Sequence, residues 1–352
     1  MNQRKTHLDI LRILAIFLVI YNHTPESMHY EGLEPFGLCC VSAGSFIMLM
    51  AVPLFFMISG ALLLTKDEPL PLLFRKRVLR FVLVIVIFWA IQYAFVYFRR
   101  GVPWDFGRFL ELTLCDGGIG IPTWVSWYLY AYLGLLLVLP FTRILAKNFT
   151  NANFLYLFAL QFCFCWIFPV LYALITSSAS HPLSLSLVPL CRMPGIYPFS
   201  LMYGVFYMLL GYFLEHRLAD FKPTRKKLLA LWSASFGIIA VSILVTRYAT
   251  GSFSPDEVAY GCLLLPSATL FLTVKRIHIS SPRISKPLQT FSGAVLFVML
   301  SENLFRIMLG PCTGILVQYM PLHLANLCFA FITCLAALCV GCVVKRFSFS
   351  IL

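Results

Sequence analysis

The sequence has few charged residues and no polar stretch long enough to form a soluble domain. Charged residues make up 12% of the 352 residues, whereas a soluble domain typically carries about 25%. Hydrophobic residues make up 60% and aromatic residues 16% of the chain, and the mean hydropathy is +0.87. So much apolar surface needs lipid as its solvent. We therefore predict a single transmembrane domain over residues 1–352, with no appended soluble domain.

Patterns typical of metal sites and of nucleic-acid binding are also missing. Twelve cysteines are present, but most lie inside apolar runs, where Cys acts as a small hydrophobic residue. They do not form the two spaced pairs that a zinc site needs, so no metal is predicted. The net charge is +13, but the basic residues form short clusters between apolar runs, where positive charge sets membrane topology. We expect membrane lipid as a partner and no nucleic acid.

Long apolar runs are abundant, and they predict an all-α polytopic bundle of about ten transmembrane helices. Most runs approach the ~20 residues that a helix needs to cross the membrane. They do not alternate as the strands of a membrane barrel would. The first, sixth and eighth are short. The ten runs are 8–23, 40–64, 78–98, 125–146, 153–175, 199–214, 228–248, 258–274, 288–310 and 322–344.

The distribution of basic residues predicts the orientation of this bundle. With ten spans and a cytoplasmic N-terminus, the cytoplasmic segments hold 20 of the 27 Lys and Arg residues, and the outer segments hold 6. This asymmetry follows the positive-inside rule, so both termini are predicted to be cytoplasmic. Asp9 and Arg12 interrupt the first run, which we interpret as a retained helix rather than a signal peptide. The longer outer segments 24–38, 99–124 and 176–198 are expected to cover or line a site.

Arg12 and His23 are predicted to lie on one face of the first helix. They are eleven residues apart, which corresponds to about 16 Å of helix rise and about 20° beyond three full turns. A charged Arg within a span is costly and should face the bundle interior or a wet cavity. An alternative is that Arg12 extends to the cytosolic headgroups and His23 only caps the outer helix end. The shared face and Asp9, three residues before Arg12, favour a functional role.

Several stretches of the first 145 residues resemble the acyltransferase-3 family of membrane O-acyltransferases. Residues 8–15 (LDILRILA) with Asn22 and His23 resemble its first helix, whose signature is Arg, ten residues, then His. Residues 52–60 (VPLFFMISG) resemble its second helix, and residues 126–130 (SWYLY) resemble a later one. Arg77 and Arg80 match its Arg-x-x-Arg signature. The resemblance implies an enzyme of the bacterial cytoplasmic membrane that O-acetylates a cell-envelope glycan or lipid-linked sugar, with acetyl-CoA as donor.

The ninth run departs from the pattern of that family. Many members carry a second His followed by Glu-Asn, and here Ser301 stands where that His is expected, before Glu302 and Asn303. If that His is needed, activity or specificity is altered. Glu302 is costly to bury, which makes it a candidate for the catalytic site. An equal alternative is that Arg306, four residues further on, simply neutralises Glu302.

The chemistry of acyl transfer assigns roles to these residues. Transfer to a hydroxyl needs a base near the acceptor proton, and His23, at an outer helix end beside Glu26, is the best-placed imidazole. Arg12, Asn22 or Asn303 could stabilise the charged intermediate. The cluster of Arg75, Arg77 and Arg80 suits the phosphates of a coenzyme A donor. Basic residues there also set topology and bind anionic lipid.

Two other classes of function remain open from the sequence. A transporter or flippase would share the spans and the buried charges, and would often show repeats or paired broken helices. A diverged family member without catalytic activity would act through binding, and Ser301 is compatible with this.

Overall fold

The structure is a computed structural model, which describes residues 5–24, 43–101, 105–107, 109–110, 126–177, 201–250, 261–279 and 281–347. In these ranges the chain is helical and contains no strand. The predicted all-α polytopic membrane bundle is therefore confirmed as a fold class. The three long outer segments lie largely outside the described residues, and Glu26 lies outside them entirely.

The described chain forms ten helical stretches that follow the ten predicted runs. Three of them contain a short π-helical segment, labelled η: η1 and η2 lie between two α-helical parts, and η3 ends its stretch. The elements are α1 (Thr6–Asn22), α3 (Ala51–Leu63), α4 (Leu70–Leu73), η1 (Phe74–Val78), α5 (Leu79–Arg100), α7 (Ser126–Asn148), α8 (Asn151–Phe162), η2 (Cys163–Ile167), α9 (Phe168–Ser177), α11 (Leu201–Tyr212), η3 (Phe213–Arg217), α12 (Arg225–Thr250), α14 (Leu264–Lys275), α15 (Pro282–Tyr319) and α16 (Leu322–Phe347).

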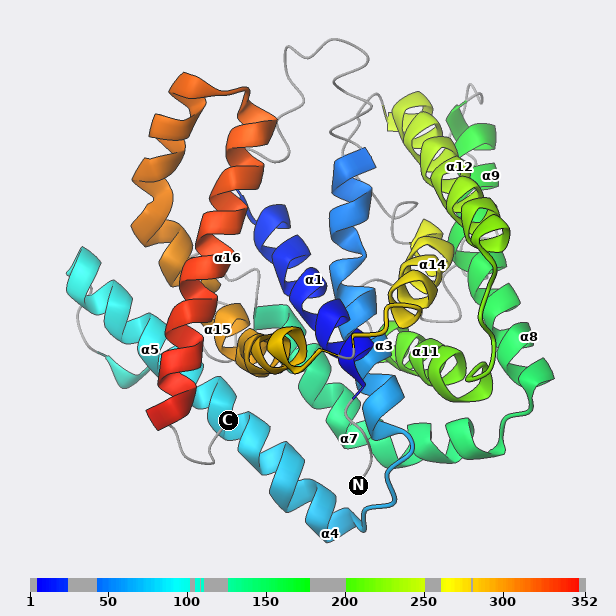
Figure 1. The fold of residues 1–352 in the computed structure, drawn as a ribbon, viewed down its shortest axis with the longest axis horizontal. Coiled ribbons are helices and arrows are strands. Elements are labelled where there is room, and N and C mark those ends of the chain that lie inside the picture. The colour runs from blue at the N-terminus through cyan, green and yellow to red at the C-terminus, as the bar shows by residue number, and fades with distance from the viewer. Residues whose placement is uncertain are drawn as a thin grey trace.

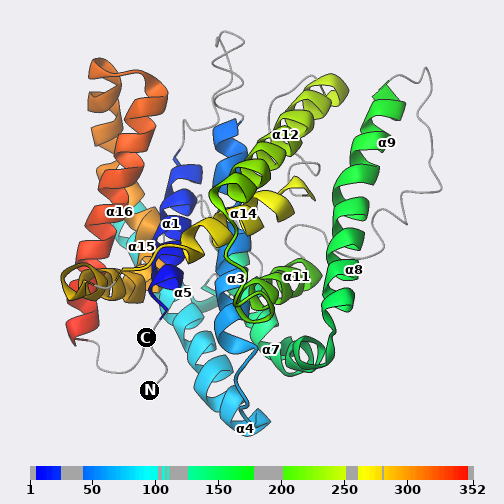
Figure 2. The ribbon, with the colours of Figure 1, turned by 45° about the vertical axis from the view of Figure 1, so that its right-hand side comes forward.

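Seven of the described helices are long and apolar enough to cross a membrane. α1, α11 with η3, and α14 fall short of that standard, and they correspond to the three runs that were short in the sequence. These three helices lie inside the bundle, where α1 packs against α3, α14, α15 and α16, and α11 packs against α3. Figures 1 and 2 show α1 and α3 in the middle, with α15 and α16 on one side and α8, α9 and α12 on the other. The ten-span count and the cytoplasmic termini stay predictions.

Two glycines allow α3 and α11 to approach backbone to backbone. A Cβ atom added at Gly60 would lie 1.9 Å from the carbonyl oxygen of Met208, and one added at Gly211 would lie 2.0 Å from that of Met57. Small residues at helix interfaces permit this close packing in membranes. The contact holds α3 against α11, and α3 forms one wall of the site described below.

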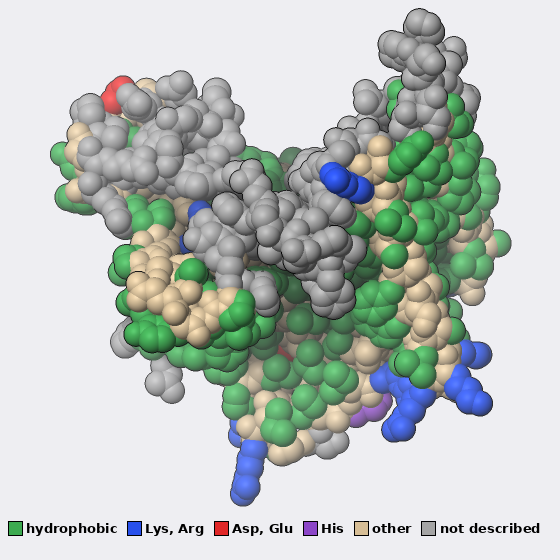
Figure 3. Space-filling view, turned by 90° about the horizontal axis from the view of Figure 1, so that it is seen from above, with side chains coloured by type: hydrophobic (Ala, Val, Ile, Leu, Met, Phe, Trp, Pro, Cys, Tyr) green, Lys and Arg blue, Asp and Glu red, His purple; other side chains and the backbone are tan. Residues whose placement is uncertain are grey.

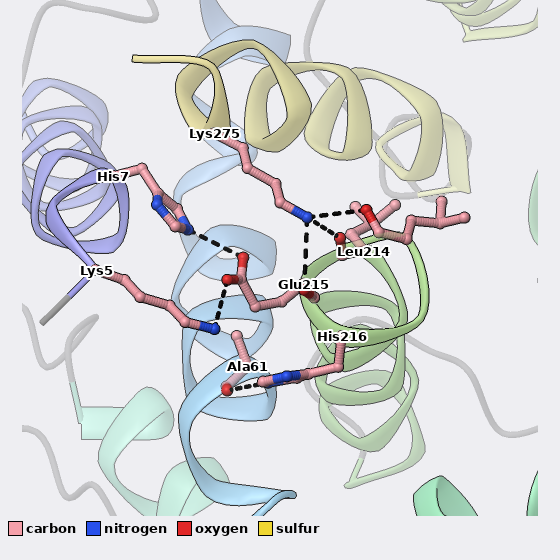
Figure 4. Close-up of polar contacts among 8 residues, drawn as sticks. Lys5, His7, Ala61, Leu214, Glu215, His216 and Lys275 are labelled. Carbon is pink, nitrogen blue, oxygen red and sulfur yellow. Dashed lines mark hydrogen bonds and ion pairs between the residues drawn. The ribbon is translucent and has the colours of Figure 1, made fainter. Parts of the chain in front are cut away.

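Polar contacts anchor the beginning of α1 (Figure 4). The Lys5 ammonium lies 2.7 Å from one carboxylate oxygen of Glu215, and His7 Nε2 lies 3.0 Å from the other. Lys275 donates to the carbonyl of Leu214 at 2.7 Å, and His216 is hydrogen-bonded to the carbonyl of Ala61 at 2.8 Å. These contacts join α1, α3, η3 and α14, so they fix the position of the helix that carries Arg12 and His23.

The outer surface suits a lipid environment. Hydrophobic side chains cover most of the described surface that is visible in Figure 3, and charged groups stand apart from them. Large exposed apolar side chains occur on several helices, including Leu83 on α5, Leu155 on α8, Leu244 on α12 and Leu335 on α16. Such a surface would be unfavourable in water.

Candidate functional site

His23 and Glu302 form a buried pair between α1 and α15. His23 is the residue that caps the C-terminal end of α1, and Glu302 lies in the middle of α15. His23 Nδ1 lies 2.8 Å from Oε1 of Glu302. The Glu302 side chain is 1% exposed and that of His23 is 16% exposed. The other carboxylate oxygen of Glu302 is buried and has no hydrogen-bond partner among the described residues.

Arg306 binds the end of α1 instead of Glu302. Its Nη1 donates to the carbonyl oxygen of His23 at 2.8 Å, and its Nη2 donates to Oδ1 of Asn303 at 2.9 Å. The described residues show no ion pair between Arg306 and Glu302. A cation at a helix C-terminus is electrostatically favourable. The sequence offered Arg306 as the residue that neutralises Glu302, but the structure places His23 in contact with Glu302.

Ser301 turns toward its own helix. Its hydroxyl donates to the carbonyl of Phe297 at 2.8 Å, and the residue is 8% exposed. Such a bond to the preceding turn satisfies a hydroxyl inside a membrane helix. The position where the family pattern expects a second His therefore holds a small, internally satisfied side chain.

Arg12 lies at the other end of the same α1 face. Its Nη1 lies 3.4 Å from Oδ1 of Asp9 and 3.3 Å from the hydroxyl of Ser292. Ser292 and Glu302 both belong to α15, so Arg12 and His23 face the same neighbouring helix, as the sequence predicted. The two contacts also show that α1 and α15 run parallel. Arg12 stays about 16 Å along the helix axis from His23, so the structure does not bring the two side chains together.

A cavity of about 530 Å³ opens beside Arg12 and carries many basic side chains. We call it the basic cavity. Its cationic lining residues are Arg12, Lys66, Lys76, Arg77 and Arg80. Its apolar and hydroxyl-bearing lining includes Phe55, Ser59, Leu62, Phe81, Tyr128, Tyr132, Ser292, Leu296 and Met299. The predicted Arg77 and Arg80 thus lie on this cavity, whereas Arg75 is exposed and does not line it.

Glu68 compensates part of the positive charge near the basic cavity. Arg77 donates two hydrogen bonds to its carboxylate, at 2.9 and 2.6 Å, and Arg143 donates one at 2.9 Å. The hydrogen bond from Arg77, against a smaller opposing effect of burial, lowers the pKa of Glu68 from 4.5 to about 2. The described residues offer no ion-pair partner to Lys66, Lys76 or Arg80. Anion-binding capacity therefore remains in the cavity.

Sequence reasoning did not single out Lys66, Ser59 and Tyr132 as site residues. Helical spacing alone could have shown that Arg75 does not share a helix face with Arg77 and Arg80. Arg77 and Arg80 are three residues apart and share a helix face, whereas Arg75 is about 200° from Arg77. The contributions of Ser59 and Tyr132 depend on how α3 and α7 pack, which local spacing does not encode.

Comparison with known proteins decides the family. A family model described as an acyltransferase domain matches residues 6–346. The chain belongs to the acyltransferase-3 family. The match extends the resemblance of the first 145 residues across α15 and α16, so Glu302 lies within the family domain. No curated protein and no solved structure matches significantly.

Membership of this acyltransferase family gives the geometry a chemical meaning. An imidazole hydrogen-bonded to a buried carboxylate is held in one orientation and is suited to accept a proton. A cavity rich in Arg and Lys is suited to bind phosphate groups. The two features lie along one contact between α1 and α15.

Proposed function

We propose that the protein transfers an acyl group, acetyl in the first instance, from coenzyme A to a hydroxyl of a cell-envelope glycan or lipid-linked sugar. In this proposal the enzyme works in the bacterial cytoplasmic membrane, and the donor enters from the cytosol. The observation that carries it is the buried His23–Glu302 contact of 2.8 Å on the same α1–α15 interface as the basic cavity. Acyltransferase activity itself follows from the family.

The reaction proceeds by direct attack on the thioester. His23 accepts the proton of the acceptor hydroxyl through Nε2, since Nδ1 faces Glu302. The hydroxyl oxygen forms a bond to the thioester carbonyl carbon, and the carbon–sulfur bond then breaks. The proton passes from His23 to the departing thiolate, which leaves as free coenzyme A. Glu302 holds the ring and stabilises the imidazolium while the proton resides there.

The basic cavity holds the donor in this proposal. Arg77 and Arg80 bind donor phosphates, together with Lys66 and Lys76, because guanidinium groups form paired hydrogen bonds with phosphate oxygens. The apolar walls, including Phe55 and Leu62, accommodate the arm that carries the thioester. Arg12 acts on the donor inside the cavity. Asn303, next to Glu302, is nearer to the developing oxyanion than Arg12 is.

The test uses purified protein in lipid nanodiscs with acetyl-CoA, and it measures release of free thiol. We expect His23→Ala to lower the rate by about 10²–10⁴-fold, the usual contribution of a general base. His278→Ala is the matched control, because His278 is exposed in the segment after α14. Full activity in the His23→Ala enzyme would exclude this mechanism. Passage of labelled substrate across vesicles without covalent change would instead support a transporter.

The acceptor is tested in cells. Surface glycans from cells with and without the gene are compared by mass spectrometry, and loss of an acetyl mass from one glycan identifies the acceptor class. Restoration by the wild-type gene, but not by the His23→Ala gene, is the expected result. Identical glycan masses in all strains would remove the glycan from the proposal.

A further inference from the structure

The basic cavity ends one helical turn short of the His23–Glu302 pair. On α15 the lining residues are Ser292, Gly293, Val295, Leu296 and Met299, and Glu302 does not line the cavity. Met299 is 5% exposed, and Glu302 is 1% exposed. The helix rises about 4.5 Å from residue 299 to residue 302 and about 6 Å to residue 303. Met299 therefore occupies the turn between the end of the cavity and the pair.

The direction of the side chains strengthens this placement. Residues three and four apart lie on one helix face, so Met299 shares its face with Glu302 and Asn303. Side chains of an α-helix lean toward its N-terminus, which here is the direction of the cavity. Met299 thus lies against the cavity end, and Glu302 lies on its far side.

Methionine is suited to a closure that must open. On α1 the turn beyond Arg12 carries Ile16, which is fully buried and does not line the cavity. A β-branched side chain has one strongly preferred rotamer in a helix, whereas Met has three rotatable bonds and adapts to irregular space. Of Ile16 and Met299, the side chain better suited to move without displacing a helix is therefore Met299.

We propose that Met299 is the gate between the donor cavity and the catalytic pair, and that its bulk limits the length of the acyl group transferred. This inference rests on the proposed function for its substrate class. An acetyl thioester passes when the Met299 side chain swings aside, while a longer acyl chain needs space that the side chain occupies. The gate also separates the polar cavity from the acceptor side when no donor is bound.

The first arm of the test measures access and requires no catalysis. Inverted and right-side-out membrane vesicles are treated with a membrane-impermeant thiosulfonate reagent that carries a sulfonate, because an anion is attracted to the basic cavity. Ser59→Cys, on the cavity wall, reports the side to which the cavity opens. Asn303→Cys reports access beyond the gate. Labelling is read by mass spectrometry at the engineered site, because the chain has 12 native cysteines.

We expect Asn303→Cys to be protected from the cavity side when Met299 is present, and to react at least tenfold faster when Met299→Ala is added. Met48→Ala, which changes a buried methionine away from the cavity, should leave the protection unchanged. If Asn303→Cys is labelled at the same rate in the single variant and in the double variant with Met299→Ala, the gate proposal is wrong. This holds whether both variants react quickly or neither reacts. Labelling of Ser59→Cys in each background verifies that the variants fold.

The second arm measures transfer from acetyl-, butyryl- and octanoyl-CoA by the full-length protein in nanodiscs. Met299→Ala should raise the octanoyl-to-acetyl rate ratio by about tenfold, and Met299→Phe should lower acetyl transfer by a similar factor, which is the usual range for small changes of volume in a pocket. Met308→Ala, on the exposed face of α15, should leave the ratio unchanged. If the wild type transfers no acyl group from any of the three donors, the proposed function is wrong. The labelling experiment of the first arm still tests whether Met299 closes the cavity. An unchanged ratio in Met299→Ala would overturn the length limit.

Discussion

The two ends of the α1–α15 contact differ in how they treat charge. At the Arg12 end, the Arg12 side chain is 28% exposed and lines a cavity with further cations. At the His23 end, the Glu302 carboxylate is 1% exposed and its described partner is one imidazole. The first end is open and positively charged. The second end holds a buried imidazole–carboxylate pair next to Arg306 and Asn303, and electrostatic interactions are stronger where water is excluded.

Under the proposed function, this difference corresponds to two tasks in acyl transfer. Binding a phosphate-bearing donor requires many positive charges that remain accessible, and the loss of one of them is shared by the others. Proton transfer requires one group with a fixed orientation, and nothing nearby replaces it. Substitutions at the two ends should therefore have effects of very different size.

The largest effect is expected at the buried end, from Glu302→Gln. The amide keeps the shape of the side chain but removes the negative charge that orients and stabilises the His23 ring, so thiol release from acetyl-CoA should fall by at least 10²-fold, comparable to loss of a base. The KM for acetyl-CoA should change little, because the basic cavity is intact. Comparable falls in kcat and kcat/KM would agree with a role in the transition state. An enzyme that keeps more than half of its kcat would contradict the distinction between the two ends.

An intermediate effect is expected at the open end, from a pair of arginine substitutions. Arg80→Gln removes a cation that lines the basic cavity, whereas Arg75→Gln removes an exposed one that does not. One hydrogen bond between charged groups contributes about 1.5–3 kcal/mol, and neighbouring cations compensate in part. The KM for acetyl-CoA should therefore rise by about tenfold for Arg80→Gln and by less than twofold for Arg75→Gln. Equal effects of the two substitutions, measured in the same nanodiscs, would mean that general surface charge attracts the donor.

The fold and the shared face of Arg12 and His23 could be predicted from the sequence because both depend on local periodicity. Apolar run length gave the helices, and the three short runs became the helices that fall short of a membrane span. Eleven residues of spacing placed Arg12 and His23 on one face, and both now contact α15.

The partner of Glu302 could not be predicted, because it depends on contacts between residues 279 apart in the chain. The sequence offered only Arg306, four residues away, as a group that would neutralise Glu302, and it is the packing of α1 against α15 that brings His23 to Glu302. The position of the proposed gate could not be predicted either, because it also depends on how the helices pack. Met299 is one of many apolar residues in its run, and only the end of the basic cavity distinguishes it.

The wall of the site should be sensitive to one added methyl group, with a smaller effect on activity than the two ends. Gly60→Ala places a Cβ atom 1.9 Å from the Met208 carbonyl, while Gly237→Ala meets nothing within 4 Å. Backbone atoms cannot give way locally, so α3 and α11 must separate, at a cost of about 1–3 kcal/mol or more. Gly60→Ala should lower the temperature of thermal unfolding in detergent by several degrees, and Gly237→Ala should keep or slightly raise it, because Ala favours helix more than Gly does. Equal unfolding temperatures would contradict the close contact of α3 and α11.

The smallest effect is expected at Glu68, whose carboxylate bridges Arg77 and Arg143 near the basic cavity. The pKa of Glu68 is lowered to about 2 in the folded protein from a usual value of 4.5, so its ion pairs contribute fully above about pH 5 and are lost as the pH falls toward 2. Partly exposed pairs of this kind contribute at most about 1 kcal/mol each. Glu68→Gln should therefore cost little stability at pH 7 and flatten the loss of stability between pH 5 and pH 2.

Because the substitution also releases Arg77 for the donor, the KM for acetyl-CoA should fall by about twofold to fivefold, a change of less than about 1 kcal/mol. Asp67→Asn removes a neighbouring charge without touching Arg77, and it should change neither quantity. A higher KM in Glu68→Gln would mean that Glu68 holds Arg77 in the orientation that binds the donor, rather than competing with the donor for it.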